Sequence, residues 1–205
     1  LFQAASGDIY VTGAFEGNLW KITPAGKVEK FATFPNHATV LGVVGVEGGV
    51  ALGAHRRGFQ TPAGADFSDL GSEVLMLDMS GNVTASIPGN DGDVFNGMTL
   101  DGTGKILITD SLKSSIWRFD PETQKLSLWV TDEALSSPSV SLLGANGIKV
   151  VNGWVYVGNR SKFAVYKIRI DENGQAQGPF SLVADGLPVA DDFAVGSDGT
   201  VYMPP

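Results

Sequence analysis

The sequence contains no cysteine and only two histidines among its 205 residues. Without cysteine, the chain has no disulfide, no thiolate metal ligand and no cysteine nucleophile. No apolar run approaches the roughly 18 residues that a membrane-spanning helix needs, so the sequence predicts no membrane span. Basic residues are also few, because 14 Lys and Arg stand against 22 Asp and Glu, which gives a formal net charge of -8. Such an acidic surface repels a phosphate backbone, and we expect no nucleic-acid partner.

Helical periodicity is nearly absent from the sequence. Short continuous or alternating apolar runs recur instead, and glycine, asparagine, aspartate and proline separate them. The 27 glycines and 10 prolines fit many tight turns better than disorder, because apolar runs are present throughout the chain. The sequence therefore predicts an all-β protein.

One sequence pattern recurs three times: a polar residue, a short apolar strand, a glycine-containing turn and a second apolar strand. Asn96, Asn146 and Asp191 begin the three copies, at steps of 50 and 45 residues. A repeat of this length built from four short strands is typical of a propeller blade. We expect four complete blades and two strands of a fifth, over residues 1–34, 40–87, 96–131, 146–184 and 191–205.

Four and a half blades leave unpaired strand edges, because a propeller closes by pairing its first and last strands. We infer a six-bladed β-propeller as the parent, truncated at both ends, with a closed five-bladed form as the alternative. The segments 59–72 and 136–139 are too short to separate domains. Residues 1–205 are therefore predicted to form a single β-propeller domain, with residues 56–71 as an inserted loop.

The three leading polar residues are the candidate site. In a propeller the innermost strand of each blade lines the central channel, so Asn96, Asn146 and Asp191 are expected to converge at its mouth. Carboxamide and carboxylate oxygens suit Ca²⁺ or another hard divalent cation rather than zinc. Asp192 could ligate instead or support the ligands. The alternative is turn chemistry, because Asn and Asp bond their own backbone and tolerate positive φ.

Three motifs, Asn96-Gly97-Met98, Thr109-Asp110-Ser111 and Asn146-Gly147-Ile148, resemble the senescence marker protein/gluconolactonase superfamily. Its members are six-bladed calcium-dependent lactonases and related esterases. The order Asn, Asn, Asp is also similar to the catalytic calcium site of paraoxonase-type propellers. The resemblance implies a calcium-dependent, gluconolactonase-like hydrolase of lactones or esters that acts on a small-molecule substrate. It also implies that Asn96, Asn146 and Asp191 are the calcium ligands.

The same resemblance implies that His55, supported by His37, is the base that activates water. Asp191 or Asp192 is the competing base, and each histidine as an ordinary loop residue is the alternative. Two departures from the family are present. Its first ligand, a glutamate, would lie upstream of Leu1, and gluconolactonase-like members usually have aspartate at the place of Asn146.

Two other functions stay open. A propeller serves many purposes, so a non-enzymatic ligand- or protein-binding propeller is one alternative. Similar fungal relatives imply the other, a metal-free cyclisation catalyst of the hetero-Diels–Alder type, in which Asn96 and Asn146 donate hydrogen bonds. The sequence does not determine the substrate, the oligomeric state or the compartment; we expect a soluble protein, and secretion stays open.

Overall fold

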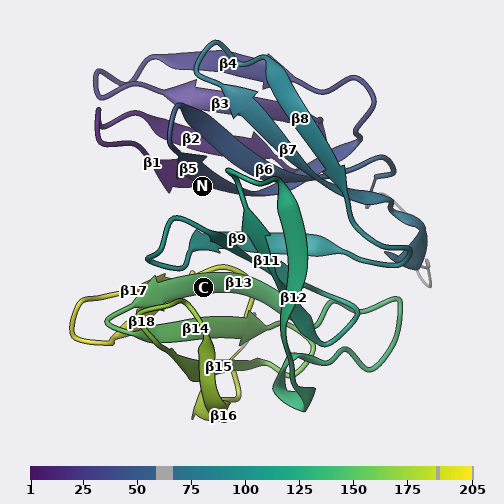
Figure 1. The fold of residues 1–205 in the computed structure, drawn as a ribbon, viewed down its shortest axis with the longest axis vertical. Coiled ribbons are helices and arrows are strands. Elements are labelled where there is room, and N and C mark those ends of the chain that lie inside the picture. The colour runs from purple at the N-terminus through teal and green to yellow at the C-terminus, as the bar shows by residue number, and fades with distance from the viewer. Residues whose placement is uncertain (59–66, 188–189, 205) are drawn as a thin grey trace. The chain divides into compact units, whose positions relative to one another are not determined.

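The structure, a computed structural model, describes residues 1–58, 67–187 and 190–204. Within these ranges the regular structure is almost entirely β-strand (Figure 1). Two 3-10 helices of three residues each complete it. The predicted all-β class is confirmed. The chain forms two compact units, Leu1–Phe95 and Asn96–Pro205. The single domain predicted for residues 1–205 stays a prediction.

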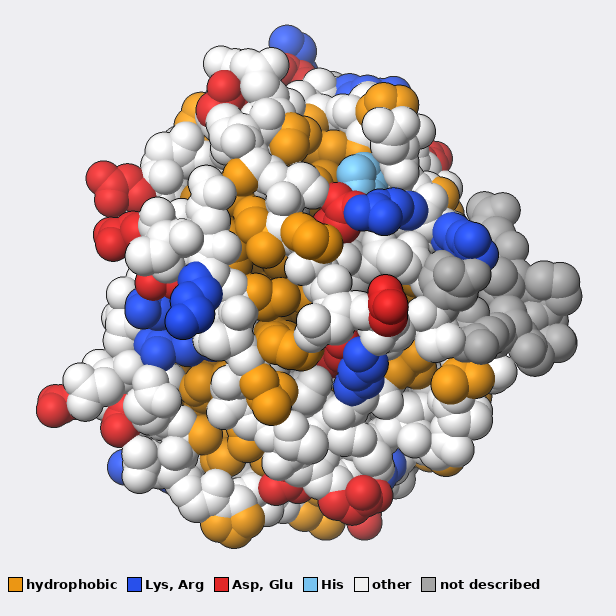
Figure 2. Space-filling model, turned by 45° about the vertical axis from the view of Figure 1, so that its right-hand side comes forward, with side chains coloured by type: hydrophobic (Ala, Val, Ile, Leu, Met, Phe, Trp, Pro, Cys, Tyr) orange, Lys and Arg blue, Asp and Glu red, His pale blue; other side chains and the backbone are white. Residues whose placement is uncertain are grey.

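The surface carries charges of both signs. On the face drawn in Figure 2, acidic side chains (red) and basic side chains (blue) lie interspersed among uncharged ones. Among the described residues, no helix has the length and apolar character needed to cross a membrane.

The first unit contains two four-stranded antiparallel sheets in which neighbouring strands follow one another along the chain. The first sheet consists of β1 (Phe2–Gln3), β2 (Ile9–Gly13), β3 (Asn18–Ile22) and β4 (Val28–Thr33). The second consists of β5 (Thr39–Val46), β6 (Gly49–His55), β7 (Ser72–Asp78) and β8 (Val83–Pro88). These sheets fall within the predicted blades 1–34 and 40–87. The 3-10 helix η1 (Phe67–Asp69) was not predicted, and residues 59–66 of the predicted inserted loop lie outside the described residues.

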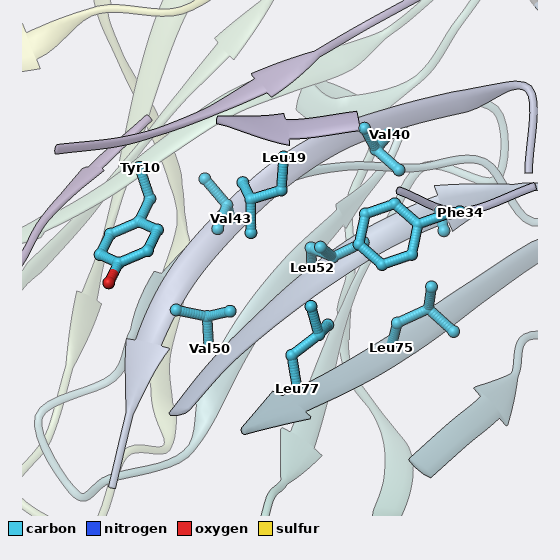
Figure 3. Packing of buried hydrophobic residues seen from close by; sticks show 10 residues of the cluster. Tyr10, Leu19, Phe34, Val40, Val43, Val50, Leu52, Leu75 and Leu77 are labelled. Carbon is cyan, nitrogen blue, oxygen red and sulfur yellow. The ribbon is translucent and has the colours of Figure 1, made fainter. Parts of the chain in front are cut away.

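The core of the first unit joins its two sheets. Leu19 on β3 packs with Leu52 on β6 and Leu75 on β7, and all three are almost completely buried. Figure 3 shows these side chains, with Tyr10 and Phe34, directed into one shared layer. Full burial of one such aliphatic side chain contributes about 1.5–3 kcal/mol, so this layer stabilises the packing of the two sheets.

The second unit repeats the same design. One sheet consists of β9 (Phe95–Leu100), β10 (Ile106–Asp110), β11 (Ser115–Asp120) and β12 (Lys125–Thr131). The next consists of β13 (Ala145–Val151), β14 (Trp154–Asn159), β15 (Ala164–Ile170) and β16 (Ala176–Ala184). The short strands β17 (Ala194–Val195) and β18 (Val201–Tyr202) form a two-stranded sheet. These sheets match the predicted blades 96–131 and 146–184 and the predicted partial blade after residue 191.

The two larger sheets of the second unit share a core. Leu107 and Ile116 from the first sheet pack with Ile148, Val155 and Ile168 from the second, and all five are buried. The alternation of buried and exposed residues is weak in β10 and β14, which are buried over most of their length. Such inner strands are covered on both faces, which explains their continuous apolar sequences. The 3-10 helix η2 (Glu133–Leu135), which was not predicted, adds Leu135 to this core.

Candidate functional site

The predicted ligands lie next to one another in the second unit. Asn96 and Asn146 are the second residues of β9 and β13, and both are buried, with 9% and 3% exposure. A β-carbon on Gly97 would lie 2.4 Å from the carbonyl oxygen of Asn146, and one on Gly147 would lie 2.6 Å from that of Asp191. Glycine permits this close approach because it has no β-carbon. The repeated Asn-Gly sequence therefore places Asn96, Asn146 and Asp191 at successive neighbouring positions.

Hydrogen bonds fix the backbone at these positions. The hydroxyl of Thr109, which is fully buried on β10, accepts a bond from the N–H of Gly97 at 2.8 Å and donates one to the carbonyl oxygen of Asn146 at 2.6 Å. In the next copy, the N–H of Gly147 donates to the carbonyl oxygen of Asp191 at 2.9 Å. The start of each copy is therefore attached to the start of the next.

Ser111 determines which way the carboxamide of Asn96 faces. The Ser111 hydroxyl donates to the carbonyl oxygen of Ala145 at 2.6 Å, and Nδ2 of Asn96 lies 3.1 Å from the same hydroxyl oxygen. A hydroxyl has one hydrogen, so the Ser111 oxygen can only accept from Asn96. This assigns Nδ2 to the Ser111 side. Oδ1 of Asn96 accepts no hydrogen bond from the described residues and is available to a ligand.

Asn146 has the most unusual environment of the three. It is 3% exposed, and its carboxamide makes no hydrogen bond with any residue that the structure describes. Among the described residues, the fully buried side-chain atoms without a hydrogen-bond partner do not include those of Asn146, so its carboxamide keeps accessible surface that a ligand can reach. A bound ion or substrate would supply the missing partner. This observation favours a binding role over simple turn chemistry for Asn146.

Asp191 and Asp192 supply negative charge beside the carboxamides. Both side chains are about half exposed, and Asp192 accepts a hydrogen bond from Lys149 Nζ at 2.6 Å. Oδ2 of Asp191 lies 3.8 Å from Nε of Arg160. Burial raises the pKa of Asp191; Arg160 acts in the opposite direction, and the charge of Asp192 adds to the increase. A divalent cation would relieve this unfavourable charge.

The three predicted ligands would offer a cation two carboxamide oxygens and one carboxylate. Within the described ranges, no group of three or more His, Asp or Glu side chains is placed to hold a metal ion. The predicted calcium site differs from such a group, because two of its three ligands are carboxamides. Carboxamide and carboxylate oxygens are typical ligands of Ca²⁺. The residues present therefore fit the cation that the family resemblance implies, whose binding stays a prediction.

His55 lies in the interior of the first unit. It is 0% exposed, and its Nε2 lies 2.8 Å from the carbonyl oxygen of Phe95, while its Nδ1 lies 3.0 Å from Oγ of Ser72. Burial lowers its pKa from 6.5 to about 4; the bond to Phe95 opposes this change, and nearby His37 adds to it. With both ring nitrogens engaged and no exposed surface, His55 is poorly placed to take a proton from a water molecule on a substrate.

His37 is bound to a different partner. Its Nε2 lies 3.4 Å from Oε2 of Glu73. Ser86 donates a hydrogen bond to the same oxygen, and Arg56 donates one to Oε1 of Glu73. Burial would raise the pKa of Glu73, but the bonds from Ser86, Arg56 and His37 outweigh it and lower the pKa. The structure thus shows His37 in an ion-pair cluster rather than bonded to His55. The catalytic role of the pair stays a prediction that this geometry does not favour.

Sequence reasoning missed the supporting residues of the site. Ser111 and Thr109 belong to one of the quoted motifs, yet neither was assigned a role. Their signal is their position at the end of β10, next to the Asn-Gly start of the next copy. Glu73 was missed as well, because nothing in the sequence shows that it meets Arg56 and His37.

The sequence matches no protein-family model and no curated protein. Solved structures do resemble the chain. Virginiamycin B lyase from Staphylococcus aureus has a TM-score of 0.65 and 15% identity over 97% of this chain and 60% of its own. A luciferin-regenerating enzyme has a TM-score of 0.67 and 17% identity over 95% of this chain and 64% of its own. A chain of a nidogen/laminin complex has a TM-score of 0.62 and 14% identity over 92% of this chain and 66% of its own.

The chain is a β-propeller protein. Its four-stranded antiparallel sheets are blades, and it forms a partial propeller because it spans about 60% of the virginiamycin B lyase chain. At 15 to 17% identity, the likeness to the two enzymes shows the fold alone. The narrower resemblance to the gluconolactonase-like family therefore stays a prediction, and the function is proposed below from the residues of the site.

Proposed function

We propose that the protein is a calcium-dependent hydrolase of lactones or esters whose cation is held by Asn96, Asn146 and Asp191. One observation carries the proposal. Asn146 is 3% exposed, and its accessible carboxamide has no hydrogen-bond partner among the described residues, in the copy of the repeat between those that begin with Asn96 and Asp191. Together with the unoccupied Oδ1 of Asn96 and the carboxylate of Asp191, it offers oxygen atoms to a hard cation.

The chain's own residues prepare this site. Ser111 holds the Asn96 carboxamide with its oxygen away from the hydroxyl, and Thr109 fixes the carbonyl of Asn146. Gly97 and Gly147 keep the neighbouring strands close. Such a preorganised arrangement costs little reorganisation when a ligand binds. A bound Ca²⁺ would polarise the substrate carbonyl and stabilise the negative charge that develops on its oxygen.

Hydrolysis also needs a group that accepts a proton from water. The oxygen of water forms a bond to the carbonyl carbon, the ring or ester C–O bond breaks, and the departing oxygen ends as an alcohol. The products are a hydroxy acid, or an acid and an alcohol, and the acid releases its proton at neutral pH. Asp191 and Asp192 are half exposed at the site, whereas His55 is fully buried, so we assign the base to one of these carboxylates.

A metal-free site is the second candidate, and the same observation favours it. The unpartnered carboxamide of Asn146 has two N–H donors, so it could donate to a substrate oxygen instead of accepting a cation. Such a site would serve a cyclisation catalyst or a non-enzymatic binding propeller. The two candidates differ in their response to calcium.

Calcium titration of the full chain separates these candidates. After treatment with a chelator, we expect added CaCl₂ to raise the midpoint of thermal unfolding, by an amount that corresponds to about 2.7 kcal/mol at 100 times the dissociation constant. The shift should shrink in Asn146→Ala and in Asp191→Ala. Asp198→Ala, which removes an exposed carboxylate from a turn of the same unit, is the matched control and should keep the full shift.

The activity of the wild-type protein is measured in parallel on small neutral lactones. Calcium-dependent hydrolysis that a chelator abolishes supports the proposal. A wild-type protein without any calcium-induced shift, or one whose shift is equal in all variants, contradicts the cation site. Binding or catalysis without calcium would then favour the metal-free candidate.

A further inference from the structure

Arg160 occupies the position in one repeat that Ser111 occupies in the one before. Ser111 follows the last residue of β10, and Arg160 follows the last residue of β14. The side chain of Ser111 reaches Asn96, and Nε of Arg160 reaches to within 3.8 Å of Asp191 Oδ2. In both repeats this position therefore faces a residue that we assign to the site, but in the second repeat the side chain is a cation.

The main chain that carries Arg160 is firmly held. Its N–H donates to the carbonyl oxygen of Gly144 at 3.0 Å, and the N–H of Ser161 donates to that of Leu143 at 3.1 Å. The preceding Asn159 is 0% exposed, and its Nδ2 donates to two carbonyl oxygens of the segment 134–136, both at 2.9 Å. The arginine thus extends from a rigid base beside the start of β13, which limits the directions that its guanidinium can take.

The guanidinium itself is little used. A guanidinium carries five N–H donors in a planar fork. The contact with Asp191, at 3.8 Å, is its single polar partner among the described residues, and 52% of the side chain is exposed. Arg118 of the same unit differs, since its side chain is 12% exposed and bonds to Asp101, Thr103 and the carbonyl of Asn173. Arg118 is a structural arginine, whereas Arg160 retains free donors next to the site.

We propose that Arg160 binds a carboxylate group on the substrate, so that the preferred substrates are lactones or esters that carry a negative charge. This inference rests on the function proposed above and extends it to a substrate class. The planar fork of a guanidinium matches a carboxylate with two parallel hydrogen bonds. The chain has a net charge of -8, which repels anions, so an anionic substrate needs a local cation at the site.

Two lactones that differ in one group test this proposal. D-Glucaro-1,4-lactone carries a carboxylate where D-glucono-1,4-lactone carries a hydroxymethyl group. In Arg160→Met we expect the KM for the anionic lactone to rise about tenfold, as loss of a charge-assisted hydrogen bond at a half-exposed site predicts, with little change in kcat. The KM for the neutral lactone should change much less, because only the contact of Arg160 with Asp191 would affect it, and that contact acts on both lactones equally. Arg160→Lys keeps the charge without the fork and should recover part of the loss.

Arg169→Met is the matched control. Arg169 lies on β15 of the same unit, where its guanidinium stacks over Trp154 at 4.9 Å, and its loss changes the net charge equally. It should leave both KM values unchanged. Equal effects of Arg160→Met on the two lactones, or the same effect in Arg169→Met, would overturn the role of Arg160.

If the wild-type protein hydrolyses neither lactone, that result contradicts the proposed hydrolase but not the role of Arg160. A binding measurement then tests Arg160. Titration calorimetry with the two lactones themselves compares the same two substituents without any reaction. We expect the anionic lactone to bind about tenfold more tightly than the neutral lactone, and this preference should vanish in Arg160→Met. Equal affinities in the wild-type protein, or a preference that survives in Arg160→Met, would overturn the inference.

Discussion

Acidification should destabilise the first unit through His55. In the unfolded chain this histidine titrates near its ordinary value of 6.5, whereas burial lowers its pKa in the folded protein to about 4. Between these values the unfolded chain binds a proton that the folded protein does not bind. Stability must therefore fall as the pH falls, and the contribution of His55 is fully present only above pH 6.5.

The magnitude follows from the same two values. One pKa unit corresponds to about 1.36 kcal/mol, so the difference between 6.5 and about 4 amounts to about 3 kcal/mol in the free energy of unfolding. Solvent does not screen this effect, because His55 is 0% exposed. The free energy of unfolding should therefore fall by up to about 1.4 kcal/mol per pH unit between pH 6 and 4.5. The total loss of about 3 kcal/mol is a large part of the stability of an ordinary domain.

Urea unfolding at pH 7, 6, 5 and 4.5, followed by tryptophan fluorescence, measures this slope. His55→Gln removes the titration and keeps an N–H that can donate to the carbonyl oxygen of Phe95, so its slope should be flatter over the same range. His37→Gln is the matched control, because it removes the other histidine, which is bonded to Glu73. It should keep most of the wild-type slope.

Equal slopes in the wild-type protein and His55→Gln would refute this reasoning. If His55→Gln does not fold, the titration of the wild-type histidines by NMR decides instead. The chemical shifts of the His55 ring should show a neutral imidazole down to about pH 4. Two histidines that both titrate above pH 6 would show that His55 is not buried as described.

Three further predictions concern the site in the second unit, and urea unfolding in the absence of added metal tests each of them. Gly147→Ala should destabilise by about 1–3 kcal/mol, because its β-carbon would lie 2.6 Å from the carbonyl oxygen of Asp191 and the strands would have to separate. Thr109→Val should cost about 1–3 kcal/mol, since it leaves the N–H of Gly97 and the carbonyl of Asn146 without their partner; a neutral result would contradict the bridge. Asn146→Ala should cost less than Asn159→Ala, because the first removes a carboxamide without partners and the second removes one that donates two hydrogen bonds. The opposite order would show that Asn146 has a structural partner.

The fold was predictable from the sequence because its signals are local. Alternating apolar runs and glycine-containing turns define each strand, and the recurrence of Asn96 and Asn146 at a blade-length interval defines the repeat. The close approach at Gly97 and Gly147 is part of the same signal, since a glycine after each asparagine is what the contact requires. The predicted order of the three leading residues around the site follows from this repeat.

The environment of single side chains was not predictable, because it depends on partners far away in the sequence. Asn146 and Asn159 lie in one sheet, yet one carboxamide has no partner among the described residues and the other bonds to the segment 134–136. His55 looked like a candidate base, but its ring bonds to the main chain of Phe95, 40 residues later. No spacing rule distinguishes these cases, since the pairing of sheets determines them.

The single hydrogen of the Ser111 hydroxyl has a consequence for the whole site. Because that hydrogen goes to the carbonyl of Ala145, the Ser111 oxygen accepts from Nδ2 of Asn96. The carboxamide therefore presents its oxygen, which donates electron pairs, on the other side. Without the hydroxyl, as in Ser111→Ala, the carboxamide could rotate by half a turn and present two N–H groups there instead. A change of one buried atom outside the binding surface would thus turn a surface that attracts cations into one that attracts anions.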